Sequence, residues 1–160
     1  MKGMSLSGTS GVFAREFDEI GRTVQVGFAG GRVISVSFPA EPPADADGDH
    51  DLLDRIDAYL GGERDEFAEV ALGLTVPTDQ REVLESLRSV PYGEEVSVSR
   101  LARLAGFDPD DPDDLETVTD ALADNPVPVL LPDHRVSGGP YATPGAVRDA
   151  LRSVEEISGG

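Results

Sequence analysis

Cysteine and tryptophan are absent from this chain of 160 residues, and histidine occurs only twice, as His50 and His134. Without cysteine the protein has no disulfides, no thiolate metal site and no thiol nucleophile. The two histidines show no HExxH spacing, which argues against a zinc site built from them and nearby carboxylates. We therefore expect no metal and no cofactor.

Long hydrophobic runs are also lacking. The run at residues 127–131 is short and contains a proline, whereas a membrane-spanning helix needs about 20 apolar residues. The first residues, MKGMSLSGTSG, contain no apolar segment of the kind found in secretory signals. Because 39% of the residues are hydrophobic, the chain can still bury a core. We expect a soluble, cytoplasmic, monomeric protein with no membrane partner.

Positive charge is scarce, since Lys2 is the only lysine and the net charge is −18. An acidic surface of this kind could serve to bind a partner. Alternatively, it could be an adaptation to molar salt, where repulsion is screened over about 3 Å. The acidity is spread over every segment and lysine is nearly eliminated, so we favour salt adaptation and expect a halophilic source.

The first part of the chain has the pattern of a small sheet followed by a helix. Residues 12–17 form an expected first strand, and apolar residues alternate on both sides of Gly30 and Gly31, which predicts a hairpin. The Pro- and Asp-rich residues 39–51 are expected to be a solvated loop. Residues 52–60 then show one apolar helix face, which ends at Gly61 and Gly62. A further strand is expected within 67–74.

From Thr78 onwards the pattern is mainly helical. A helix starting at Thr78 is expected to end before VPYG at 90–93, and Ser97 is a candidate N-cap of the next helix, which ends at Gly106. Residues 107–114 are expected to be a loop, 115–123 a short helix, and the Pro-rich 125–132 an extended segment. Thr143 and Pro144 are expected to cap a last helix.

These patterns predict an α+β fold with two domains. The first, residues 1–76, is a small β-rich domain, and the second, residues 77–160, is a helical domain with a helix-turn-helix-like pair.

The most specific motif is NPVPVLLPDHRV at residues 125–136. It resembles the active-site motif of the 6-O-alkylguanine-DNA alkyltransferases, in which Asn-Pro-x-Pro and a short apolar run lead to Pro-Cys-His-Arg-Val. The likeness extends back through VPYGEEVS (90–97) and LARLAG (101–106), and forward through Tyr141 to VRDALRSVE (147–155). Because so many matches occur in the same order, the likeness is specific. The chain is identified as a haloarchaeal-type member of this family.

The resemblance implies a ribonuclease-H-like N-terminal domain and a winged-helix-like C-terminal domain that enters the minor groove of DNA. In the family, an arginine of the recognition helix fills the gap left when a 6-O-alkylguanine is flipped out. A cysteine, deprotonated through a water and a His–Glu pair, then takes the alkyl group irreversibly.

Many of the family's functional positions hold the expected residue in this chain. The matching residues are the relay histidine His134, its partner Glu155, the turn-bracing Asn125, Arg135 of the motif, the pocket aromatic Tyr141, and Arg148 where the family often has lysine.

Three positions depart from the family's pattern. Asp133 stands at the acceptor cysteine, Glu116 at the flipping arginine, and Val98 at a tyrosine that helps to rotate the nucleotide. The loop between Val136 and Tyr141, which corresponds to the family's pocket wall, is also short. We therefore expect a homologue that does not catalyse the transfer.

Asp133 could have one of several roles. Its carboxylate could accept a methyl group as an ester, but it is a much poorer nucleophile than a thiolate. It could form a hydrolytic dyad with Glu155, although no electrophile is evident. We favour a carboxylate paired with His134 or Arg135, or one that faces solvent in a disused pocket. His134 is expected to be a structural histidine bonded to Glu155, and Tyr141 and Arg148 are expected to be packing and surface residues.

Two classes of present function remain open. The preserved frame favours an alkyltransferase-like lesion sensor that binds double-stranded DNA and recruits other repair proteins. Glu116, Val98 and the absence of lysine and arginine between Leu104 and His134 favour a protein-interaction or regulatory module that no longer binds DNA. An active transferase is the third possibility. If DNA is bound at all, we expect the binding to be weak.

Overall fold

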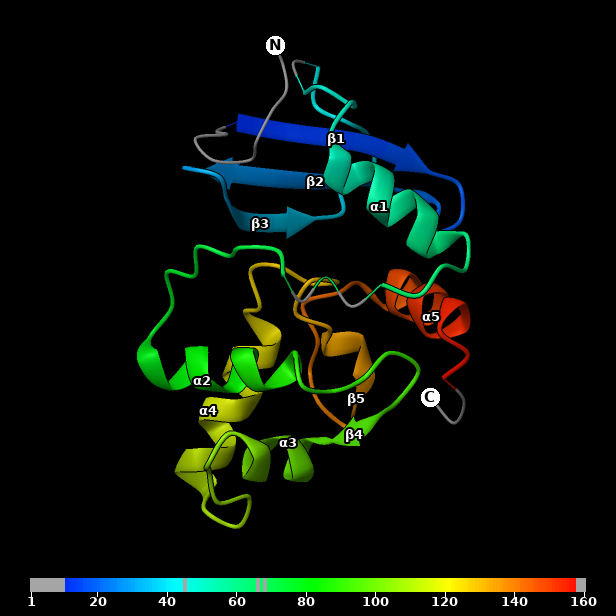
Figure 1. The fold of residues 1–160 in the computed structure, drawn as a ribbon. Helices are drawn as coiled ribbons and strands as arrows, with labels where there is room; N and C mark the ends of the chain where they lie inside the picture. Colours follow the sequence, from blue (N-terminus) through cyan, green and yellow to red (C-terminus); the bar gives the residue numbers. More distant parts are fainter. Residues whose placement is uncertain (1–10, 45, 66, 68, 158–160) are drawn as a thin grey trace.

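The computed structural model describes residues 11–44, 46–65, 67 and 69–157. It confirms a mixed helix and sheet fold (Figure 1). Strands β1 (Gly11–Phe17), β2 (Arg22–Ala29) and β3 (Arg32–Ser37) form an antiparallel sheet in that order. The predicted hairpin is present, since Gly30 and Gly31 connect β2 to β3 with φ of 58° and 81°. Two consecutive positive φ values are the mark of the hairpin turn that matches the twist of the strands.

Helix α1 (Asp51–Leu60) lies against one face of this sheet. Its buried residues recur at helical spacing, so one apolar stripe faces the sheet. They are Leu52, Leu53, Ile56, Tyr59 and Leu60. His50 caps its N-terminus through the side chain, and Gly61 is the C-cap, as the predicted stop required.

The predicted strand within 67–74 is wrong. Among the described residues of this segment a single bridge forms, between Leu72 and Val33, with hydrogen bonds from Val33 N to Ala71 O (3.0 Å) and from Gly73 N to Val33 O (2.9 Å). This segment covers the outer edge of β3, and Asp47 covers the edge of β1 through a similar bridge to Phe13. Irregular chain thus pairs with both sheet edges and protects them.

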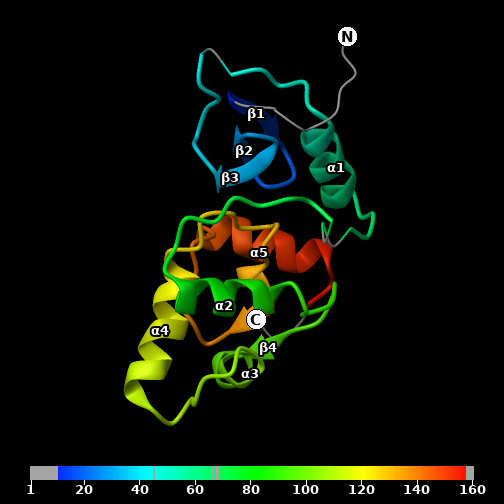
Figure 2. The same cartoon turned by 60° about the vertical axis from the view of Figure 1, so that its left-hand side comes forward.

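In the second half of the chain, α5 lies on the side nearest to the sheet (Figure 2). It contains α2 (Thr78–Leu87), β4 (Val96–Ser97), α3 (Val98–Leu104), α4 (Pro112–Ala123), the short 3-10 helix η1 (Asp133–Arg135), β5 (Val136–Ser137) and α5 (Gly145–Val154). Helices α2, α3 and α4 pack on one another, and β4 pairs in parallel with β5. Ser97 caps α3 through its side chain, as predicted.

Three local predictions need correction. Helix α4 begins at Pro112, inside the predicted acidic loop, because Asp111 is an N-cap and proline suits the first helical position. Residues 125–132 are not extended but turn sharply, with a bridge between Pro128 and Leu131. The side chain of Thr143 makes no capping bond to α5, because Asp133 engages it instead.

The buried residues form one hydrophobic cluster that includes side chains from both halves. A hydrogen bond from Val36 N to Pro126 O (2.8 Å) also joins the halves, so the boundary at residue 76 stays a prediction. Among the described residues, no helix is long and apolar enough to cross a membrane.

Candidate site around residues 133–135

The short helix η1 buries three consecutive ionisable side chains. Asp133 and His134 are 0% exposed and Arg135 is 3% exposed. Charged side chains are almost never fully buried unless they are paired. Their hydrogen-bond partners therefore decide what this segment can do.

His134 and Arg135 both engage the carboxylate of Glu155, the residue that caps the C-terminus of α5. His134 Nε2 lies 2.7 Å from Glu155 Oε2. Arg135 donates twice, from Nε to Oε1 (2.9 Å) and from Nη2 to Oε2 (3.0 Å). Burial favours the neutral acid, but the hydrogen bonds from His134 and Arg135 outweigh it and lower the pKa of Glu155. The His134–Glu155 pair is thus part of a buried triad with Arg135.

A residue that sequence reasoning missed completes this cluster. Tyr59 of α1 donates its hydroxyl to Glu155 Oε2, and the hydroxyl oxygen of Tyr59 lies 3.3 Å from His134 Nε2. Burial, with the negative charge of Glu155, raises the pKa of Tyr59. The available signal was spacing, because Tyr59 follows Ile56 by three residues and so puts a hydroxyl on an apolar helix face, where it requires a partner.

The VPYG turn supplies backbone partners to the cluster. Gly93 N donates to Glu155 Oε1 (3.0 Å), and Arg135 Nη1 donates to Val90 O (2.7 Å). The VPYG turn, which resembles the family's corresponding segment, therefore bonds to both Glu155 and Arg135.

Arg152 fixes the backbone of η1 from the side of α5. Its Nη1 donates to His134 O (2.9 Å), and its Nη2 pairs with Glu95. The ring atom Nδ1 of His134 is buried and has no hydrogen-bond partner among the described residues. The histidine is thus held at Nε2 and at its backbone.

Asp133 belongs to a separate network. Its Oδ1 accepts from Thr143 Oγ1 (2.6 Å), and its Oδ2 accepts from Ala142 N (3.1 Å), Asn125 Nδ2 (3.3 Å) and Thr143 N (3.4 Å). Burial raises the pKa of Asp133, although the hydrogen bonds from Thr143 and Asn125 act in the opposite direction. Both carboxylate oxygens are therefore occupied.

This arrangement corrects the expectation for Asp133. It makes no hydrogen bond to His134 or Arg135, and it does not face solvent. Nor does it share donors with Glu155, so the two carboxylates are not arranged as a dyad. A carboxylate that accepts four hydrogen bonds away from solvent is poorly placed to attack a substrate.

Asn125 braces the turn that leads to Asp133. Its Nδ2 also donates to Leu131 O (2.8 Å), and its Oδ1 accepts from Val127 N (3.0 Å). Within this turn Val129 has a φ of 77°, a strained conformation for a β-branched residue. The surrounding contacts must impose this conformation, and Val129 is buried among them.

Tyr141 and Arg148 contact each other. The guanidinium carbon of Arg148 lies 4.0 Å from the centre of the Tyr141 ring, and its Nη2 donates to the Tyr141 hydroxyl (3.1 Å). The ring face is thus occupied by a side chain of the same protein. A planar ligand could stack there only by displacing Arg148.

The remaining predicted positions lie outside the buried cluster. Val98, the first residue of α3, is buried. Glu116 is exposed on α4, in line with three other exposed carboxylates at helical spacing, Asp113, Asp120 and Asp124. Among the described residues none of these four forms a salt bridge. The structure therefore brings His134 and Arg135 to Glu155, and Asn125 to Asp133, but leaves Glu116 on an outer face.

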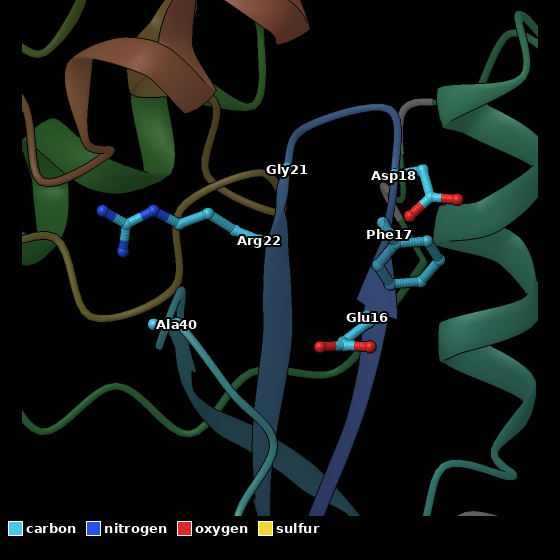
Figure 3. A pocket seen from close by; sticks show the side chains of 6 residues that line it. All are labelled: Glu16, Phe17, Asp18, Gly21, Arg22 and Ala40. Atoms are coloured by element: carbon cyan, nitrogen blue, oxygen red, sulfur yellow. The ribbon is translucent and has the colours of Figure 1, made fainter.

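A hollow of about 190 Å³ lies at the turn between β1 and β2. In Figure 3, Phe17 of its lining points towards α1, and Arg22 points away from that helix. Arg22 Nη1 donates to Phe38 O (2.6 Å), so a backbone group holds its guanidinium. None of the predicted site residues lines this hollow. Within the described ranges, no group of three or more His, Asp or Glu side chains could hold a metal ion.

Known proteins resemble this chain in sequence and in fold. Residues 78–154 match the model of the "6-O-methylguanine DNA methyltransferase, DNA binding domain" family. The methylated-DNA–protein-cysteine methyltransferase of Methanopyrus kandleri is 32% identical over 107 residues, which are 65% of this chain and 77% of that protein. The protein of the same name from Mycobacterium leprae is 34% identical over 88 residues, 55% of this chain and 50% of that protein.

Solved structures resemble almost the whole chain. Mycobacterium tuberculosis OGT in complex with DNA has a TM-score of 0.71 and 25% identity, covering 91% of this chain and 92% of that one. The O6-methylguanine-DNA methyltransferase of Pyrococcus kodakaraensis has a TM-score of 0.69 at 21% identity, covering 92% and 100%, and so shows a shared fold.

Proposed function

Since the chain belongs to the 6-O-alkylguanine-DNA alkyltransferase family, a family of DNA-repair proteins, we propose that it is a member without transfer activity. The relatives are named for a protein cysteine that is methylated, and this chain has no cysteine. One observation carries the proposal: Asp133, at the acceptor position of the motif, is fully buried and both its oxygens accept hydrogen bonds. No other group in the cluster replaces a thiolate.

Intact-mass spectrometry tests this proposal. After incubation with duplex DNA that contains 6-O-methylguanine, the protein should gain no methyl mass. A family member with its cysteine, treated in parallel, is the positive control. A methyl adduct on the unmodified chain, mapped to Asp133 by fragmentation, would overturn the proposal.

The variant Asp133→Cys should also fail to transfer efficiently. The new thiol would lie in the closed network of Thr143 and Ala142, and Glu116 would still stand where a flipping arginine is needed. Transfer by this variant at the rate of the control enzyme would show that position 133 is accessible. It would also show that the residues facing the groove can flip the nucleotide without an arginine at position 116.

We propose an α+β organisation like that of the family: a ribonuclease-H-like domain at residues 1–76 and a winged-helix-like domain at residues 77–160. The likeness to solved structures over nearly the whole chain supports this division. DNA-repair descent supports a cytoplasmic location, and the net charge of −18 supports adaptation to molar salt. A monomer agrees with the closed sheet edges.

A second candidate function is a protein-interaction or regulatory role without DNA. It is favoured by α4, whose exposed stripe of Asp113, Glu116, Asp120 and Asp124 would meet phosphates with like charge. The lesion-sensor alternative instead requires selective binding by this helix. Anisotropy titrations with lesion and plain duplexes, at each salt concentration that keeps the protein folded, separate the two. We expect weak binding at most and equal affinities; tight, lesion-selective binding would restore the sensor.

A further inference from the structure

Residues 138–143, which join β5 to α5, form a segment that we call the strap. It begins with Gly138, whose φ of 85° suits glycine. At the next residue, Gly139, an added methyl carbon would lie 3.0 Å from side-chain carbons of both Leu122 and Val98. This end of the strap is therefore in close contact with α4 and with the start of α3, and only glycine fits there without displacement.

The other end of the strap is tied to Asp133. The N–H of Ala142 lies 3.1 Å from Asp133 Oδ2 and also 3.1 Å from Leu122 O at the end of α4. Thr143 adds its hydroxyl (2.6 Å) and its N–H (3.4 Å). Three of the four hydrogen bonds that Asp133 accepts thus come from the strap, and the fourth comes from Asn125.

The middle of the strap is covered as well. The ring of Tyr141 lies under the guanidinium of Arg148, which also donates to Val136 O (3.2 Å) at the base of the strap. The strap is thus held by packing at Gly139, by stacking at Tyr141 and by the carboxylate at its end.

We propose that the strap is a latch fastened by the Asp133 carboxylate, which closes the interior at residue 133 to solvent and to any ligand. A buried carboxylate must accept hydrogen bonds to offset the loss of water, and the strap supplies most of the donors. The closed strap and the buried carboxylate therefore stabilise each other. This contact is autoinhibitory in form, because the strap covers the residue of the motif that a ligand would have to reach. The proposal concerns closure alone and does not depend on whether the protein binds DNA.

Because the chain lacks cysteine, a single introduced thiol can report on opening of the strap. Val98 is a suitable position, since it is buried and touches the strap at Gly139. The thiol of V98C should react slowly with a neutral maleimide in the native protein. In the V98C background, Thr143→Val removes the hydroxyl donor with little change of shape, and the reaction should become about tenfold faster or more. Thr143→Ser retains the donor and should leave the rate slow.

The matched control is Thr119→Val, which removes a hydroxyl whose bonds within the described part of the chain go to carbonyls of its own helix α4. It should leave the rate unchanged. Unfolding midpoints of all variants, measured in denaturant, show whether the reaction proceeds through global unfolding. The proposal is overturned if V98C reacts as fast as the unfolded chain, or if Thr143→Val leaves the rate unchanged. It also fails if the rate rises only in proportion to global unfolding, or if Thr143→Ser accelerates it equally.

Discussion

At the scale of single residues, Asp133 and Glu155 are both buried carboxylates with opposite shifts. Burial raises the pKa of Asp133, whereas hydrogen bonds from His134 and Arg135 outweigh burial and lower the pKa of Glu155. The difference lies in the donors, because Asp133 has neutral ones and Glu155 has a guanidinium and an imidazole. Glu155 therefore stabilises the fold as a charged carboxylate. Asp133 is held in place by hydrogen bonds from neutral donors.

Tyr59 gives the first prediction. Tyr59→Phe removes the hydroxyl that donates to Glu155, without changing the packing of the ring. We expect a loss of about 1–2 kcal/mol in the free energy of unfolding. Glu155→Gln should cost more, about 3–5 kcal/mol, because it leaves the buried Arg135 without a counter-charge. Denaturant titrations measure both.

Tyr92→Phe is the control for that series. Its hydroxyl donates to Val154 O at 3.4 Å, and its side chain is only partly buried, so the change should cost less than the change at the buried Tyr59. Equal stability of Tyr59→Phe and the unmodified protein would mean that the contact between α1 and Glu155 contributes nothing to stability.

At the scale of elements, the exposed face of α4 predicts a gain of function. Glu116→Arg replaces a carboxylate with a cation on the helix that the resemblance assigns to the minor groove. Affinity for plain duplex DNA should rise, and the slope of log affinity against log salt should steepen by about 1 for one phosphate contact. Anisotropy titrations at several salt concentrations measure the slope.

Glu85→Arg is the matched control, since Glu85 is an exposed carboxylate on α2. It makes the same change of charge on a different helix. If both variants gained affinity equally, net charge alone would explain the result and α4 would not present to a groove.

The start of α1 predicts a dependence of stability on pH. His50 Nδ1 accepts from Leu52 N (3.0 Å), and its ring stacks on Phe28 with centres 4.5 Å apart. Burial lowers the pKa of His50 from 6.5, although nearby aspartates, with Asp51 the strongest, act to raise it. The neutral ring therefore stabilises α1 above pH 6.5, and this contribution is lost as pH falls through the lower folded-state pKa.

Thermal unfolding at pH 7.5 and pH 5 tests this cap. The unmodified protein should lose stability at the lower pH, and His50→Asn, which retains a capping side chain that does not titrate, should lose less. Parallel losses in both proteins would place the acid-sensitive group elsewhere.

At the scale of the whole molecule, the net charge of −18 predicts a requirement for salt. Lowering the ionic strength from 1 M to 0.01 M extends the screening length from about 3 Å to about 30 Å. The unfolding midpoint should therefore fall. Circular dichroism melts across this range measure it.

A triple variant of the α4 face, Glu116→Gln, Asp120→Asn and Asp124→Asn, should need less salt, because it removes three of the exposed like charges. A melting temperature that did not change with salt would argue against halophilic adaptation. An acidic surface for a basic partner would then explain the charge better.

Local pattern alone determined most elements of this protein. The turn at Gly30 and Gly31, the caps at Ser97 and Gly61 and the apolar stripes of α1, α2 and α5 depend on residues close in sequence, so their physics can be read locally. The motif at residues 125–136 likewise identified the family, because residues can be matched in order without knowing which of them are in contact.

Only the tertiary structure decided what the buried charges do. Tyr59 reaches Glu155 across 96 positions of sequence, and Thr143 reaches Asp133 across 10. No local rule links such pairs, and a buried carboxylate takes whichever donors the packing brings to it. For the same reason Thr143 is a partner of Asp133 where sequence predicted a helix cap, and residues 125–132 turn to present Asn125 where sequence predicted an extended chain.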